Sequence, residues 1–374
     1  MASSPRARSL RWTAPLAVIA FIALLAAVPN LAGAATPSVA PLTAQQLIVK
    51  IHQADVAALS GTLKLTTNLG IPDLGALSSA ASGGGGDHHG RTGFNPTDLL
   101  SGSHQAKIWF DGPDKQRVAL IQSMSETDVV HNGHDVWTWD STAQTVTHVT
   151  LSGATSSDRK PAASAEQPVQ TPAQMADELL AHLDASTTVT VTKPVVVAKR
   201  DAYQLILAPK APASTVDRVV IAADAATGLP LQVQVFAKGQ KAAAIQLGFS
   251  SISYSKPAAS NFKFTPPPNA IVTNKAAGDH TGAGAKSTTR PAGGSGGNQP
   301  VVVGQGWGTV AIISGVTLPG QVDQYLQGAT AVNGAFGSGR LLATPLVNVL
   351  VLNDGRIAVG AVNASALEAA VAGH

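Results

Sequence analysis

The stretch that decides the fold is KIWFDGPDKQRVALIQSMSETDVVHNGHDVWTWDSTAQTVTHVTL, residues 107–151. Short β-prone runs alternate in it with turn signals such as Gly112-Pro113-Asp114 and Asn132-Gly133. Asn-Gly suits the type I′ turn of a β-hairpin, because both central residues of that turn need a positive φ. The stretch therefore predicts five consecutive strands, at residues 107–111, 117–124, 127–131, 135–140 and 145–151.

Two helices and a second series of strands extend this pattern. Thr43 can cap a helix over residues 45–58, in which apolar side chains recur at helical spacing, and a strand at 60–68 follows,. Thr171-Pro172 opens a second helix, with proline at the first helical position. Further strands are predicted at 188–191, 195–197, 202–208, 216–223, 231–237 and 244–254. We therefore expect an α+β fold, one large curved antiparallel sheet with helices on one face.

Residues 1–34 have the layout of an export signal. They contain three arginines, no acid, an apolar core at 16–28 and the small residues Ala32-Gly33-Ala34,. The core of 13 residues is shorter than the roughly 20 of a membrane-spanning helix,. No charge occurs between residues 13 and 35, however, so an uncleaved N-terminal anchor is the alternative. Both cases predict an exported protein, secreted or held at the extracytoplasmic face of the cytoplasmic membrane.

The composition excludes several classes of protein. Of 25 basic residues, three lie in the first 34, which leaves 22 against 22 acidic residues and no basic footprint for nucleic acid,. Charged residues make up 13% and hydrophobic residues 44%, which argues against a disordered chain,. The chain has no cysteine, so it has no disulfide and no attachment point for the lipid of a bacterial lipoprotein,.

The remaining segments divide the chain. Residues 70–103 form a long glycine-containing insertion, which fits a lid or plain disorder equally well,. Residues 42–272 are the main domain, and residues 273–300 are a Gly/Ala/Ser/Thr-rich linker,. Residues 301–374 predict a small C-terminal α+β unit, with a strand at 307–314, a helix at 321–327, a hairpin of 341–352 with 356–362, and a final helix at 365–371.

The order of these motifs resembles the LolA/LolB/RseB-like superfamily, most closely actinobacterial LolA-like or outer membrane lipoprotein-sorting proteins. The motifs are the helix after Thr43 leading into Ser60-Gly61-Thr62, Trp109 before Gly112-Pro113-Asp114-Lys115, NGHDVWTWD at 132–140, AATGLPLQVQVFAKG at 225–239 and NFKFTPPPNA at 261–270. The resemblance covers residues 42–272. It implies a curved antiparallel half-barrel whose concave face, closed by helices and loops, holds acyl chains.

Three functions fit this resemblance. The first is a non-enzymatic lipid or lipoprotein carrier of the cell envelope. The second is an RseB-like sensor or regulator that binds a membrane anti-sigma factor, which the linker and C-terminal unit favour, because LolA carriers are short. The third is a structural envelope protein with a tightly packed sheet and no ligand.

Apolar side chains that alternate in phase within their strands are the candidate lipid-binding residues. An ordinary core under the two helices is the alternative interpretation of each. Two amphipathic helices are too little to cover so wide a sheet, however, which predicts an apolar cavity. The candidates are Ile108, Phe110, Trp137, Trp139, Tyr203, Leu205, Leu207, Val233, Val235, Leu247 and Phe249.

The sequence predicts no catalytic site, cofactor or metal. Asp87-His88-His89, with His104 nearby, is the most metal-like cluster, but no second pair at ligand spacing accompanies it and a structural zinc site takes four ligands,. No Gly-x-Ser-x-Gly elbow occurs. Gly304-Gln305-Gly306 precedes a strand rather than joining a strand to a helix, so it is no dinucleotide loop.

Overall fold

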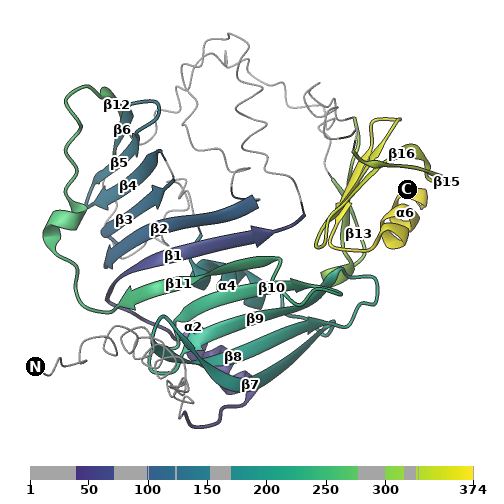
Figure 1. Cartoon of the computed structure of the whole chain (residues 1–374), viewed down its shortest axis with the longest axis horizontal. Coiled ribbons are helices and arrows are strands. Elements are labelled where there is room, and N and C mark those ends of the chain that lie inside the picture. The colour runs from purple at the N-terminus through teal and green to yellow at the C-terminus, as the bar shows by residue number, and fades with distance from the viewer. Residues whose placement is uncertain are drawn as a thin grey trace, which may run out of the picture. The chain divides into compact units, whose positions relative to one another are not determined.

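The computed structural model describes residues 39–70, 99, 101–122, 124–151, 170–276, 300–315, 326 and 328–373. Within them the chain forms two β-sheets, one of twelve strands and one of six (Figure 1). The expected export signal lies outside the described residues, as do Asp87-His88-His89 and most of the expected insertion and linker.

The larger sheet is open and contains two antiparallel meanders. Its strand order is β12-β6-β5-β4-β3-β2-β1-β11-β10-β9-β8-β7. The first meander contains the five consecutive strands predicted from residues 107–151. The strands are β1 (Ala58–Asn68), β2 (Ser101–Asp111), β3 (Lys115–Ile121), β4 (Glu126–Asn132), β5 (Asp135–Asp140), β6 (Thr145–Thr150), β7 (Thr187–Val197), β8 (Arg200–Pro209), β9 (Val216–Asp224), β10 (Pro230–Ala237), β11 (Ile245–Ser253) and β12 (Ile271–Ala276).

Strand β1 joins the two meanders. It pairs antiparallel with β2 on one side and with β11 on the other, so that Ser60 lies opposite Trp109 and Ser253. The β1–β11 register shifts between Thr62 and Leu63. The first strand after the N-terminal helix is thereby central in the sheet.

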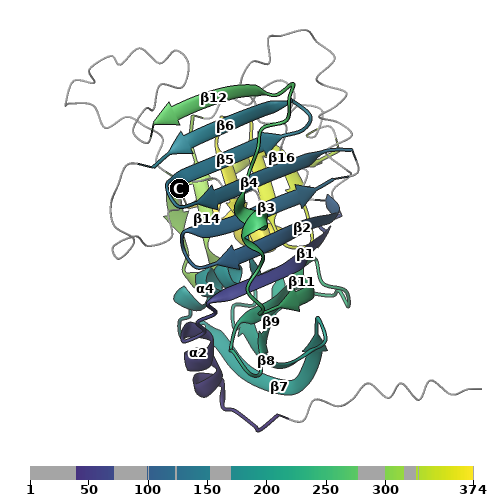
Figure 2. The same ribbon diagram turned by 90° about the vertical axis from the view of Figure 1, so that its left-hand side faces the viewer.

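Strand β12 is the exception to the antiparallel pattern, because it pairs parallel to β6. The chain reaches this position through residues 254–270, which we call the strap. Figure 2 shows the strap crossing the strands of the first meander on its way from β11 to β12. A 3-10 turn in the strap, η2 (Ala259–Phe262), contacts β3 and β4 and buries Phe262. The main domain was expected to end at residue 272, whereas its sheet continues to Ala276.

Helices α2 (Ala44–His52) and α4 (Pro172–Ala181) begin where the sequence predicts. Each starts with a capping box, in which the threonine hydroxyl accepts a bond from the backbone amide of the third helical residue, a glutamine, and the glutamine side-chain oxygen accepts one from the threonine amide,. The capping pairs are Thr43 with Gln46 and Thr171 with Gln174. Among the described residues no helix is long and apolar enough to cross a membrane.

Three predicted boundaries differ from the structure. Helix α2 ends at His52 rather than at residue 58, because Gln53 caps it and β1 begins six residues after its end. Strand β2 begins at Ser101, inside the expected insertion. The runs at 188–191 and 195–197 form one strand, β7, whose register shifts between Thr192 and Val195.

The smaller sheet has the order β13-β14-β18-β17-β16-β15. Its β17–β18 pair is the hairpin predicted around residues 353–355, while the predicted strand 341–352 is divided between β16 and β17. Helix α6 (Ala364–Ala372), capped by Asn363, packs on one face of the sheet. The strands are β13 (Val301–Val303), β14 (Val310–Ile313), β15 (Thr330–Gly334), β16 (Gly337–Ala343), β17 (Asn348–Leu352) and β18 (Ile357–Gly360).

Substitutions at two glycines can measure how tightly the β9–β10 turn packs on α2. Gly228 and Gly239 have φ angles of 80° and 79°. A Cβ at Gly228 would lie 2.4 Å from the carbonyl oxygen of Lys50, whereas a Cβ at Gly239 meets nothing within 4 Å. We expect Gly239→Ala to cost about 1 kcal/mol of unfolding free energy through its φ angle alone. Gly228→Ala should cost about 2 kcal/mol more, because α2 must move.

Urea unfolding of the two variants measures this difference. Equal losses would show that the turn and the helix are not in firm contact.

Candidate functional site

Nine of the eleven candidate residues share one face of the larger sheet. Side chains alternate between faces along a strand, and residues opposite one another across two strands share a face. Leu247 lies opposite Val233, for example, and Ile221 lies opposite both Val233 and Leu205. We call this face, on which α2 and α4 pack, the inner face. Its candidates are Ile108, Phe110, Tyr203, Leu205, Leu207, Val233, Val235, Leu247 and Phe249.

Helices α2 and α4 cover the inner face over strands β7 to β11. Buried residues of both helices belong to one core cluster together with Leu205, Leu207 and Val233, each of which is 0% exposed. Tyr203 belongs to the same cluster, and its hydroxyl donates to the carbonyl oxygen of Ala40 at 2.8 Å. These candidates pack against the protein's own helices.

The inner face continues beyond the helices. Ile108 and Phe249 belong to a second cluster, and Phe110 packs against it. The cluster takes its buried residues from β1 to β3 and from β7 to β11, and none from α2 or α4 among the described residues. The principal contacts of α4 are with β10 and β11, and those of α2 are with β7 and β8. The apolar face is therefore wider than its helical cover.

Trp137 and Trp139 lie on the opposite, outer face. Thr138, which separates them, is opposite Val129, and Val129 is in line with Ile108 across β3. The two tryptophans therefore do not join the other nine candidates.

On the outer face, Trp137 packs against two other rings of the chain. Its indole stacks on the imidazole of His148, with ring centroids 3.7 Å apart, and lies 5.6 Å from the ring of Phe264 in the strap. The Nε2 atom of His148 is 2.7 Å from Oδ1 of Asp135. Trp137 thus has an aromatic partner on its own sheet and another in the strap.

A polar group on the same outer face also ties down the strap. The Arg117 guanidinium donates two hydrogen bonds to the buried carboxylate of Asp128 and a third, at 3.4 Å, to the carbonyl oxygen of Asn261. It also lies 5.2 Å from the Trp109 ring. Arg117 therefore joins β4 to the strap, and its hydrogen bonds are all made to other groups of the chain.

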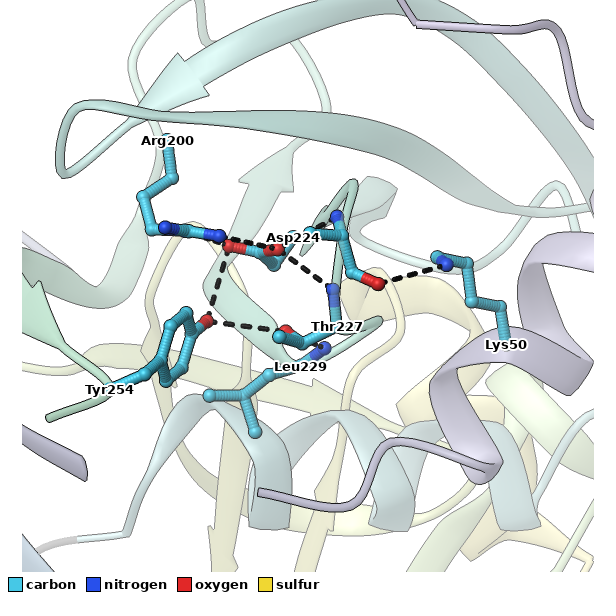
Figure 3. Close-up of polar contacts among 7 residues, drawn as sticks. Lys50, Arg200, Asp224, Thr227, Leu229 and Tyr254 are labelled. Carbon is cyan, nitrogen blue, oxygen red and sulfur yellow. Dashed lines mark hydrogen bonds and ion pairs between the residues drawn. The ribbon is translucent and has the colours of Figure 1, made fainter. Parts of the chain in front are cut away.

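A second buried carboxylate, Asp224, organises one end of the larger sheet (Figure 3). Asp224 is 0% exposed and accepts hydrogen bonds from Arg200 through both oxygens. The Tyr254 hydroxyl donates to it at 3.1 Å, and the backbone amides of Ala226 and Thr227 donate at 2.8 and 2.9 Å. This carboxylate therefore links β8, the β9–β10 turn and the end of β11.

These contacts shift two pKa values in opposite directions. Burial opposes ionisation of Asp224, but the bonds from Arg200 and the two amides outweigh it and hold the pKa of the carboxyl below its usual range,. Burial raises the pKa of Tyr254, and the neighbouring Asp224 charge adds to that rise. At neutral pH the group is thus an ionised carboxylate that accepts a bond from a neutral phenol.

Sequence reasoning identified the turn at 224–228 but not this network. Asp224 accepts hydrogen bonds from the backbone amides two and three residues after it, which is the pattern of an Asx turn,. Arg200 and Tyr254 lie more than twenty residues away on either side, and no spacing rule connects them. Lys50 of α2 adds a bond to the carbonyl oxygen of Ala226 at 3.3 Å (Figure 3).

An open cleft of about 460 Å³ adjoins the network. Thr227 and Tyr254 form one side of it, and residues 55–58, between α2 and β1, form another. Asp111 at the end of β2 and Lys256 in the strap complete the lining. No local sequence pattern indicates this cleft, because its walls come from four separate segments.

No metal site is found among the described residues, where no three His, Cys, Asp or Glu side chains come together. His104, expected beside the Asp87-His88-His89 cluster, lies 2.7 Å from the carbonyl oxygen of Ser101 through its Nε2 atom.

Comparison with known proteins finds similarity at the level of structure alone. No family model and no curated protein sequence matches the chain. The MucA/MucB complex of Pseudomonas aeruginosa matches with 13% identity, a TM-score of 0.42, and coverage of 88% of this chain and 96% of that chain. A LolA superfamily protein from Nitrosomonas europaea has 10% identity and a TM-score of 0.22, covering 60% of this chain and 99% of that one.

An outer membrane lipoprotein-sorting protein domain from Vibrio parahaemolyticus has 12% identity and a TM-score of 0.22, covering 59% of this chain and 94% of that one. The chain is thus similar, at low identity, to these solved structures.

Removing Arg200 tests the buried carboxylate. Arg200→Met leaves Asp224 without its charged partner, and we expect a loss of about 3 kcal/mol in unfolding free energy at pH 7. The pKa of Asp224 is lowered by folding, so the contribution of the pair is present above the unfolded value of about 3.9 and is lost as the pH falls through the folded value,. The difference between the two proteins should therefore shrink below about pH 4.

Urea unfolding at several pH values measures this, with Asp217→Asn as the control. Asp217 forms an exposed ion pair with Arg218, whose removal should cost less than about 1 kcal/mol,. A pH-independent loss in Arg200→Met would contradict the assignment to Asp224.

Proposed function

We propose that this chain is an exported, non-enzymatic protein of the cell envelope that binds the acyl chains of a lipid or lipoprotein on its inner face. The observation that carries the proposal is the apolar face itself, which extends past α2 and α4 onto β1 to β3. The side chains on that part of the face, such as Leu63, Ile108 and Phe249, are at most 6% exposed, so a bound acyl chain takes the place of groups that pack on them in this structure,.

The energetics suit this function. Each buried methylene contributes about 0.8 kcal/mol, so a chain of about sixteen carbons contributes roughly 12 kcal/mol before the costs of association and ordering. Such a ligand needs a dry surface and no reactive side chain. The buried Asp128 and Asp224 are held by arginines and backbone amides, as structural carboxylates are.

Leu65 is the best position to test this site. It lies on the inner face of β1, opposite Leu247, and is only partly buried. The adjacent Lys64 is exposed on the outer face and provides a matched control. We expect Leu65→Glu to lower the amount of co-purifying acyl ligand about tenfold, because a carboxylate beside the acyl chain must be desolvated. Lys64→Glu should leave it unchanged.

Native mass spectrometry and lipid extraction of protein purified from its own host measure the ligand. Wild-type protein that is reproducibly free of lipid would overturn the proposal.

A second function, a sensor or regulator that binds a membrane protein, is supported by the smaller sheet. Its face opposite α6 is apolar on β14, β18 and β17, and none of these side chains belongs to the core under the helix. On β16 the same face carries Leu342 and the exposed Arg340, which lies opposite Val351. No other described helix or strand makes extensive contact with that face. Its residues are Ala311, Ile313, Leu342, Val349, Val351, Ile357 and Val359.

Val351→Glu separates the two functions. The wild-type bait should capture a membrane protein partner and the Val351→Glu bait should not, since desolvating a carboxylate at the centre of this face opposes an apolar interface. The acyl ligand of the larger sheet should be retained. Affinity capture from detergent-solubilised host membranes, with Asp354→Asn on the adjacent exposed turn as control, measures the difference. Unchanged capture by Val351→Glu would exclude this face as the partner site.

A further inference from the structure

The cleft beside Tyr254 has the size of a small-molecule site. Its volume of about 460 Å³ falls within the roughly 300–1,000 Å³ of ligand pockets,. Its walls come from residues 55–58, the end of β2, the β9–β10 turn and the start of the strap. Cavities formed between separate elements in this way are common ligand sites.

The charges around the cleft are divided between two corners. The Asp111 carboxylate forms ion pairs with two ammonium groups, those of Lys256 at 3.2 Å and Lys115 at 3.9 Å. This corner therefore has two positive charges and one negative charge. Asp55 lines the cleft as well, is exposed, and has no ion-pair partner among the described residues. The cleft lining therefore carries the carboxylates of Asp55 and Asp111 and the ammonium group of Lys256, and Lys115, just outside the lining, shares Asp111 with Lys256.

The floor between these corners is rigid. Tyr254 is held by hydrogen bonds to Asp224 and Thr227, and Arg200 lies 4.7 Å from the centre of its ring. All of these contacts are made within the protein. A preorganised wall lowers the entropic cost of ordering a bound ligand.

One wall of the cleft is apolar and leads to the inner-face cluster. Val56, Ala57 and Ala58 line it, and Val56 and Tyr254 both pack against the cluster that contains Phe110 and Phe249. A ligand in the cleft would thus contact charged groups and an apolar surface at once, which is the chemistry of an amphiphile.

We propose that this cleft binds the headgroup of a zwitterionic amphiphile, with the ligand's ammonium group at Asp55 and its phosphate at Lys256. The chemical class is a phosphoethanolamine-type headgroup, since it carries both charges on a short chain. This proposal deepens the lipid-binding function and rests on it for the source of the ligand. The headgroup site itself is separately testable.

The test uses the full-length protein and three soluble probes: glycerophosphoethanolamine, glycerophosphocholine and glycerophosphoglycerol. Ligand-observed NMR titration measures each dissociation constant. We expect saturable binding of glycerophosphoethanolamine and at least about tenfold weaker binding of the other two. Choline has no N–H to donate to Asp55, and the glycerol compound has no cation.

Variants locate the site. Asp55→Asn should weaken glycerophosphoethanolamine binding about tenfold by removing a charge-assisted hydrogen bond, and Lys256→Gln should do the same at the phosphate. Ala57→Trp should abolish binding by filling the cleft, since Ala57 is exposed and small. Asp217→Asn, an exposed aspartate outside the cleft lining, should bind like the wild type. Unchanged binding by Asp55→Asn and Ala57→Trp would overturn the site.

A final arm identifies the source of the headgroup. Monomeric dihexanoylphosphatidylethanolamine should bind more tightly than glycerophosphoethanolamine, because its chains gain apolar contact. Equal affinity would overturn the assignment to a lipid and indicate a free soluble zwitterion. If no probe binds while acyl ligand still co-purifies with the protein, the cleft proposal fails and the proposed lipid-binding function stands.

Discussion

The pairing of β1 with β11 is the constraint on which the rest of the larger sheet depends. These strands lie at opposite ends of the domain sequence, and their ladder turns two separate meanders into one continuous surface. Without it, the helix-covered half and the strap-covered half would each expose a free edge beside an apolar face. Closing so long a loop costs entropy before any contact repays it, so we expect this ladder to form late in folding.

This single surface has two differently used faces. The inner face is apolar across both meanders, and helices cover only the part on the second. The outer face of the first meander carries aromatic and ionic groups, and the strap covers it with Phe262 and Phe264. The cleft at Tyr254 lies where the start of the strap meets the ends of β1 and β2, so it borders both systems.

Much of this architecture could be predicted, because its signals are local. The capping threonines Thr43 and Thr171 and the turn at residues 224–228 each specify a short piece of backbone, and the structure has each in place. The hairpin predicted at Asn132-Gly133 is present too, but its loop residues are Gly133 and His134, because Asn132 pairs with Asp135 and only Gly133 of the predicted pair has a positive φ.

What could not be predicted depends on register and on distant partners. Which face a side chain occupies is known within a strand but not between strands until the pairing is known, since a shift of one residue exchanges the faces. Trp137 and Trp139 were therefore grouped with Ile108, although they lie on the other side of the sheet. The Arg200–Asp224–Tyr254 group and the parallel strand β12 join segments that no local signal connects.

The late position of β12 in the sequence has a consequence for synthesis. Strand β6 is complete at Thr150, but the strand that covers its edge does not begin until Ile271. During more than a hundred residues of chain elongation, the edge of β6 has unpaired backbone groups next to the valines of the first meander. An open strand edge of this kind is a template for pairing with other chains. The nascent protein is thus most prone to aggregation before β12 emerges. In the finished sheet the edge is β12 itself, a short strand that carries Lys275, and short edge strands with lysine resist such pairing,.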